Sequence, residues 1–292
     1  MKPISLFFSV ATLAAGAAWI GADAYAESEA RKRIDQRIAQ MQDVAEIRYE
    51  DVDVNLLSRD VSLHGVSVRP RQSREALLIE RVVIDEFDSN ATDVPAFMSL
   101  QLHKAEIATA SLGTLGAGLR ELDYPDKVNI SLTADYHYDR RERQLDIRRL
   151  EFDLADAGSL SLALKLSNIE LGSDETSLMR LLFGYRNLII HNAELRLQDN
   201  SLAERILQQQ AEEQGISADQ VRSNALAALD ARIADSEDPL SRETLTQLRQ
   251  FIAEPDTLSA SIRPEQPLKI RNIPRRADPL TIARMLNLQI KG

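Results

Sequence analysis

The sequence has 292 residues, a net charge of −10 and no cysteine, and aromatic residues make up 5% of it. This length is enough for one extended domain or two compact domains with a sizeable core. The absence of cysteine excludes disulfide bonds and thiolate metal sites. The acidic balance and the scarcity of aromatic side chains argue against nucleic acid as a partner, because that binding depends on Lys and Arg contacts to phosphate and on base stacking.

The chain opens on an apolar segment, residues 3–22, that carries no charge. A segment of this length can cross a bilayer as a helix. An Ala-Tyr-Ala run follows it and places small residues where a signal peptidase requires them. Residues 1–26 therefore predict either a transmembrane anchor or a signal peptide, and both alternatives place the rest of the chain across a membrane.

Residues 27–45 have the spacing of an amphipathic connecting helix, with Ile34, Ile38 and Met41 on one stripe and charged residues around the remainder. Such a helix would continue the preceding segment into the aqueous phase. This continuity favours retention of residues 1–26 as an anchor over their cleavage.

A strand motif with apolar residues at its first, third, sixth and eighth positions recurs through residues 46–198. Its copies begin at Val61, Leu77, Leu100, Leu145, Leu164 and Leu188. One extra residue falls between the second and third apolar positions, and a β-bulge inserts such a residue while bending the strand. We therefore expect a curved, mainly antiparallel sheet that forms a trough with an apolar concave side and a charged convex side.

Helical spacing returns in residues 199–254, which predict a three-helix insert packed on the sheet as a lid or end-cap. Ser201 and Ser217 each begin a capping-box pattern, and Asp238-Pro239 precedes the third helix. Residues 255–292 predict short strands and a short helix that complete the sheet domain. The predicted fold class is thus α+β, with an N-terminal transmembrane helix, a curved bulged sheet and a C-terminal helical insert.

The sequence contains no recognisable catalytic or metal-binding motif. His64, His103 and His191 occupy equivalent positions in three motif copies, but no acidic or second histidine partner lies at ligand spacing near any of them. The chain also has no serine in a glycine-flanked elbow, no nucleophilic cysteine and no cofactor fingerprint. We expect no enzyme activity, no cofactor and no metal site.

The N-terminal arrangement resembles that of a known family. The apolar segment, the connecting helix, the stretch Ile47–Val68 and the stretch Leu77–Ile84 are together similar to the start of AsmA-like proteins of the Gram-negative envelope, and a similar layout occurs in YdgA-like proteins. The resemblance covers about the first 110 residues. It implies a periplasmic protein on a single inner-membrane anchor, with an apolar groove that handles acyl chains.

Two function classes follow. The first is a membrane-anchored periplasmic protein whose apolar groove handles the acyl chains of membrane lipids or assists envelope biogenesis. The second is an anchored scaffold that binds another envelope protein and whose groove is filled by its own helices. In the first case, the candidate residues that line the groove are Leu63, Ile79, Leu102, Leu132, Ile147 and Leu166.

Overall fold

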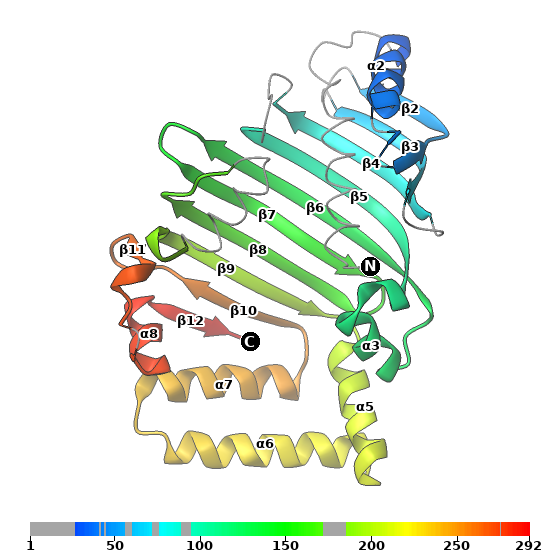
Figure 1. The fold of residues 1–292 in the computed structure, drawn as a ribbon. Helices are drawn as coiled ribbons and strands as arrows, with labels where there is room; N and C mark the ends of the chain where they lie inside the picture. The colour runs from blue at the N-terminus through cyan, green and yellow to red at the C-terminus, as the bar shows by residue number, and fades with distance from the viewer. Residues whose placement is uncertain are drawn as a thin grey trace. The chain divides into compact units, whose positions relative to one another are not determined.

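The chain divides into two compact units in the computed structural model (Figure 1). Unit 1 consists of Met1–Tyr138 and Arg149–Ala155, and unit 2 consists of Asp139–Arg148 and Asp156–Gly292. The structure describes residues 27–40, 42–43, 45–55, 60–71, 76–88, 95–171, 185–274 and 276–292.

Unit 1 is built mainly from antiparallel strands in the order β1-β3-β4-β5-β6, and β2 pairs with the first half of β3. Its elements are α2 (Glu27–Gln40), β1 (Ala45–Arg48), β2 (Asp51–Asn55), β3 (Asp60–Pro70), β4 (Leu77–Phe87), β5 (Phe97–Ala108), η1 (Thr109–Leu112), α3 (Thr114–Glu121) and β6 (Lys127–Asp139). Strand β7 (Gln144–Leu154) contributes residues to both units.

The first three motif copies, which were predicted to line a trough, form part of the core of unit 1. Every apolar position of these copies is buried, and the burial pattern changes phase in the middle of each copy. On β5 the change is a β-bulge, since Leu102 lies opposite Leu132 whereas Ala105 lies opposite Ile130. On β3 and β4 the irregular positions face each other, so the register between these two strands is unchanged.

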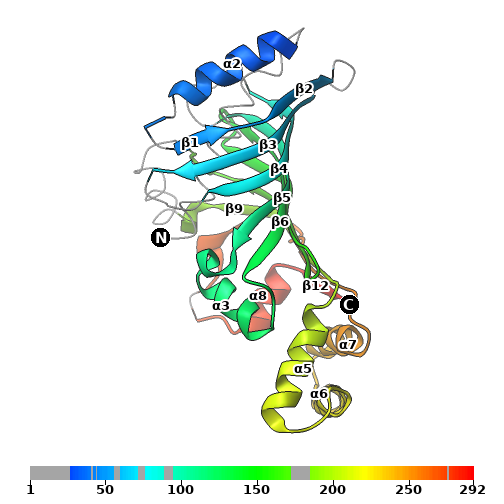
Figure 2. The same cartoon turned by 90° about the vertical axis from the view of Figure 1, so that its right-hand side faces the viewer.

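The predicted connecting helix is present as α2 and docks on the strands of unit 1. Ile34 is only 1% exposed. Arg31 forms an ion pair with Asp51 on β2 at 2.5 Å, and the Tyr49 hydroxyl donates to Asp35 Oδ1 at 2.6 Å. Figure 2 shows α2 lying along β1 and β2. The helix is thus held by one buried aliphatic side chain and by polar contacts around it.

Unit 2 combines a second set of antiparallel strands, in the order β8-β9-β10-β12 with β11 on β9, with four α-helices among its described residues. Its further elements are β8 (Gly158–Ser167), η2 (Tyr185–Asn187), β9 (Ile189–Asp199), α5 (Leu202–Gln214), α6 (Ala218–Asp235), α7 (Pro239–Ala253), β10 (Thr257–Ile262), β11 (Leu268–Lys269), η3 (Ile270–Asn272), α8 (Pro279–Met285) and β12 (Leu288–Lys291).

Two predicted bulges in unit 2 have different outcomes. On β9 the predicted bulge is confirmed, because the register shifts at His191. On β8 it is wrong: the strand ends at Ser167, and Asn168 has a positive φ of 60°. Ile169 and Leu171 therefore lie beyond the strand that was expected to contain them. The φ of Asn168 alone does not explain this end, since Gly65 on β3 and Lys104 on β5 have similar values within strands that continue.

The three predicted helices of the insert are α5, α6 and α7. Ser217 caps α6, as predicted, and Asp238, which was predicted to precede the third helix, caps α7. The predicted Ser201 cap is wrong, because Asp199 Oδ1 accepts the hydrogen bond from Ala203 N at 3.0 Å in its place. The aspartate two residues earlier reaches the same unpaired amides of the first turn.

The insert packs beside the sheet of unit 2. Helix α7 contacts β12 and β10, and Gly292 N donates to Gln247 Oε1 on α7 at 2.9 Å. Figure 1 shows α7 running alongside β12, with α6 on the far side of α7. The helices therefore flank the β12 side of this sheet, in the manner of an end-cap.

The structure does not support the predicted transmembrane helix or, with it, the predicted single-pass inner-membrane location. Residues 3–22, on which both predictions rested, lie outside the described residues. Among the described residues, no helix is long and apolar enough to cross a membrane. The longest described helix, α6, has 18 residues and carries charged side chains along its length.

The predicted fold class, α+β with a transmembrane helix, is also wrong. The structure is mostly antiparallel β-sheet, with twelve strands among the described residues. The strands dominate because the alternating motif extends over most of the chain before the helical insert.

Candidate apolar binding face

One face of the unit 2 sheet is lined by Leu, Ile and Ala side chains alone. Residues directly opposite one another in an antiparallel pair lie on the same face, so the registers define rows across the strands. The rows are Leu160-Leu197-Leu258, Leu162-Leu195-Ala260-Ile290, Leu164-Ala193-Ile262-Leu288 and Leu166-Ile190-Leu268. We call this set of residues the apolar face.

The opposite side of the same strands is mainly polar. Ser161 on β8 pairs with Arg196 on β9, and Arg196 pairs in turn with Ser259 on β10. Alternation along a strand therefore separates an aliphatic side from a hydrated side. This pattern is typical of an antiparallel sheet that packs one face against an apolar partner and exposes the other face to water.

None of the side chains of the apolar face is fully buried. Leu160 is 43% exposed and Leu195 is 45% exposed, and the other members are half-buried. The described helices do not change this, because α7 contacts the sheet at β12 and β10. In the part of the chain that the structure describes, unit 2 thus keeps a contiguous aliphatic surface in contact with water, and such surfaces mark binding sites.

The structure distributes the six predicted groove residues among different surroundings. Leu63, Leu102 and Leu132 lie in one cross-strand row of unit 1, joined through Val82. Leu63 and Leu102 are each 4% exposed, which makes them core residues. Ile79 is 3% exposed and belongs to the adjacent row with Val66.

The remaining two predicted groove residues are half-buried. Ile147 lies on β7, and Leu166 lies on β8 opposite Ile190. Leu166 is the one predicted residue that belongs to the apolar face. The other members were missed because the motif, and not simple alternation, guided the selection. The uninterrupted alternation from Leu160 to Leu166 is the signal that could have identified them.

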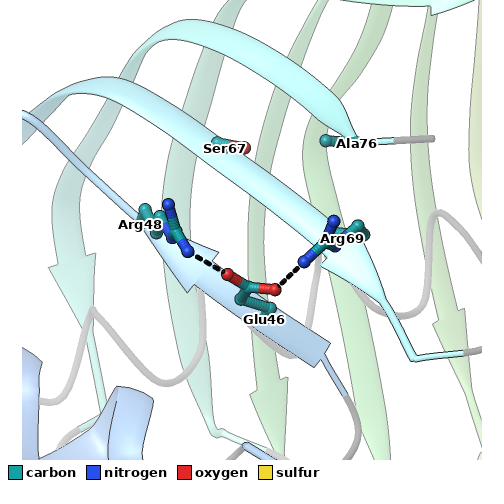
Figure 3. A pocket seen from close by; sticks show the side chains of 5 residues that line it. All are labelled: Glu46, Arg48, Ser67, Arg69 and Ala76. Atoms are coloured by element: carbon teal, nitrogen blue, oxygen red, sulfur yellow. Dashed lines mark hydrogen bonds and ion pairs between the residues drawn. The ribbon is translucent and has the colours of Figure 1, made fainter. Parts of the chain in front are cut away.

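A small polar pocket lies in unit 1, with a volume of about 150 Å³ and a lining of Glu46, Arg48, Ser67, Arg69 and Ala76. Figure 3 shows the Glu46 carboxylate between the two arginines. Arg48 pairs with Glu46 at 2.5 Å, and Arg69 pairs with its other oxygen. The hydrogen bond from Arg69 lowers the pKa of Glu46. Because Glu46 already engages both arginines, we assign no ligand to this pocket.

The three aligned histidines have separate partners or surroundings. His64 Nε2 lies 2.9 Å from Asp53 Oδ2, and His191 Nε2 lies 2.8 Å from Ser167 Oγ. Burial lowers the pKa of His103, and the Arg81 charge lowers it further. No group of three or more His, Asp or Glu side chains that could hold a metal ion occurs in the described ranges.

A family model described as "Uncharacterized protein" is similar to residues 151–292, a range that includes β8 to β12 and α5 to α8. No curated protein matches the chain. The match names no ligand and no reaction, and it does not support the AsmA-like resemblance, which stays a prediction.

Proposed function

We propose that the apolar face of unit 2 binds the acyl chains of a lipid. The observation that carries this proposal is the exposure of Leu160 and Leu195. Both side chains belong to rows of aliphatic residues that run without interruption across neighbouring strands. An acyl chain laid across these rows would leave water together with the side chains beneath it. Each methylene that leaves water contributes about 0.8 kcal/mol.

The chemistry of the face favours hydrocarbon over a protein partner. The energetic centres of protein interfaces are enriched in Trp, Tyr and Arg. The apolar face has none of these residues and carries no hydrogen-bonding side chain. A surface of this kind is suited to a ligand segment that has neither charge nor polarity along its length.

The second candidate function, a scaffold whose groove is filled by its own helices, makes a different demand on the same face. It requires the helices to bury the aliphatic rows. The contacts of α7 with the β12 side and the exposure of Leu195 support the open form. A scaffold could also bind another protein on the open face, and the test below distinguishes this function from lipid binding.

The test is the binding of a fluorescent fatty acid to the purified chain, with two matched variants. Leu195→Asp places a charge in the apolar face, at a position exposed enough for the sheet to fold around it. Ser161→Asp adds the same charge on the opposite side of the sheet, where Arg196 lies in register. Circular dichroism establishes that both variants are folded.

The proposal predicts saturable binding by the parent chain and by Ser161→Asp. Leu195→Asp should bind at least about tenfold more weakly, because an unpaired charge would have to lose water beneath the chain. Lipid extracted from the purified parent should also contain acyl chains by mass spectrometry. A parent that neither binds fatty acid nor carries lipid would refute the proposal, and a protein partner lost only in Leu195→Asp would establish the scaffold function.

A further inference from the structure

A second set of side chains lies on the polar side of unit 2, at the end of the sheet where β8 stops. We call Lys165, Ser167, His191 and Lys269 the basic cluster. Ser167 pairs with Ile189 on β9, and Ile189 pairs with Lys269 on β11, which places Ser167 and Lys269 on one side of the sheet. Lys165 alternates with Leu164 and Leu166 and so shares that side.

The β9 bulge brings His191 into the same group. The register shift leaves His191 without a partner residue on β8. Its Nε2 lies 2.8 Å from Ser167 Oγ, which fixes the imidazole on the polar side. Three neighbouring strands, β8, β9 and β11, therefore each contribute a hydrogen-bonding group to one patch.

The charge of this patch is not balanced by the described residues. Lys165 and Lys269 are half-buried, and neither forms an ion pair with a side chain in the described ranges. Glu194, the nearest acid along β9, faces Arg263 at 3.6 Å. Burial lowers the pKa of His191, and the Lys165 charge lowers it further, so the positive field reaches the imidazole.

Two short helices adjoin the strands that carry the patch, and each contains an arginine. Helix η2 carries Arg186 and helix η3 carries Arg271, and the two helices pack against each other. The backbone bond from Ile270 N to Leu188 O, at 3.0 Å, joins the segments that follow β11 and precede β9.

We propose that the basic cluster binds a phosphate group, with Lys165 and Lys269 as the charged donors and Ser167 and His191 as neutral hydrogen-bonding partners. Lysine ammonium groups offer only donors, which suits an oxyanion and excludes a cation. Charge-assisted hydrogen bonds from several directions are the usual means of holding phosphate. The site lies on the opposite side of the sheet from the apolar face and does not depend on acyl-chain binding.

The experiment is a titration of the purified chain with inorganic phosphate, followed by ³¹P NMR and by the ring resonances of His191. Glycerol phosphate and vesicles of phosphatidylcholine with and without phosphatidic acid form the other two arms. Lys165→Gln and Lys269→Gln are the test variants. Lys291→Gln is the matched control, since Lys291 lies on the same side of the sheet on β12.

The parent should bind phosphate or glycerol phosphate, and each test variant should bind roughly three- to tenfold more weakly while Lys291→Gln is unchanged. Binding confined to the vesicles with phosphatidic acid, with the same dependence on the lysines, would identify the phosphate as that of a lipid headgroup. The proposal is overturned by absence of binding in all arms, or by equal weakening in Lys291→Gln. Fatty-acid binding should be unaffected in the test variants, so the two sites are tested separately.

Discussion

Leu195 on β9 lies directly opposite Leu162 on β8, and yet 45% of Leu195 remains exposed. The equivalent cross-strand pair in unit 1, Leu63 with Val82, is 4% and 5% exposed. The two units therefore use the same alternating pattern with different burial. In unit 1 the pattern builds a core, whereas in unit 2 it leaves a surface with the composition of a core.

Truncation of a leucine should have different effects in the two units. Leu102→Ala removes a buried side chain and should lower the free energy of unfolding by about 2–5 kcal/mol. Leu195→Ala removes a side chain that is already half in water and should cost less than about 1 kcal/mol. Urea unfolding followed by circular dichroism measures both. Similar losses in the two variants would contradict the assignment of Leu195 to an open surface.

The bulge on β5 gives a test of register. Deletion of Lys104 removes the extra residue, so Ala105 and Ile107, each 5% exposed, should turn toward water. The free energy of unfolding should fall by roughly 2–4 kcal/mol, mostly from the isoleucine. Asn168, in contrast, follows the end of β8, and its deletion should not invert that strand. An unchanged melting temperature for the Lys104 deletion would show that the extra residue in β5 is not needed to keep Ala105 and Ile107 buried.

Gly65 has a φ of 58° on β3. An added Cβ would lie 2.4 Å from Glu50 Cδ, but this flexible side chain can move away, so the backbone strain dominates. Gly65→Ala should therefore lower the free energy of unfolding by about 1–2 kcal/mol. Gly118→Ala on α3 is the matched control, because nothing lies within 4 Å of its added methyl and alanine favours helix. If Gly65→Ala leaves the free energy of unfolding unchanged, the left-handed conformation at this position is not required.

Acid should weaken the capping of α7. The hydrogen bond from the backbone N–H of Ser241 lowers the pKa of Asp238 below its ordinary value of 3.8, and Arg284 lowers this pKa further. A carboxylate whose pKa is lowered by folding stabilises the folded state above its ordinary pKa, and this stabilisation is lost as the pH falls below about 3.8 through the lowered value. Asp238→Asn keeps a capping oxygen but cannot titrate. The urea midpoint of this variant should therefore fall less than that of the parent between pH 5 and pH 3, and the difference should correspond to about one capping interaction. Equal falls in parent and variant would exclude this role.

The sequence predicted which residues of β3, β4 and β5 share one apolar face, because this face follows from strand alternation and from the extra residue in each motif copy, but it assigned that face to a groove and not to a core. Val61, Leu77 and Ile107 all fall where the motif placed them. The end of β8 could not be predicted, since Ser167 and Asn168 are as polar as the residues between the second and third apolar positions of the other copies, and the φ of Asn168 is close to that of Gly65 and Lys104, whose strands continue.

The candidate site was predictable only in part, for a physical reason. Alternation indicates which residues share a face, but it does not indicate what covers that face. Leu63 and Leu195 each stand between two polar residues in sequence, yet Leu63 is 4% exposed and Leu195 is 45% exposed. The basic cluster likewise depends on pairings between β8, β9 and β11, which bring Lys165 and Lys269 to one side from more than one hundred residues apart.

The central claim, that the apolar face binds acyl chains, is tested most directly by photo-crosslinking with a fatty acid that carries a diazirine on its chain. Peptide mass spectrometry then locates the label. We expect labelling of apolar-face residues on β8, β9 and β10, suppressed by an excess of unlabelled fatty acid and lost in Leu195→Asp. Labelling confined to unit 1, or labelling that competitor does not suppress, would contradict the claim.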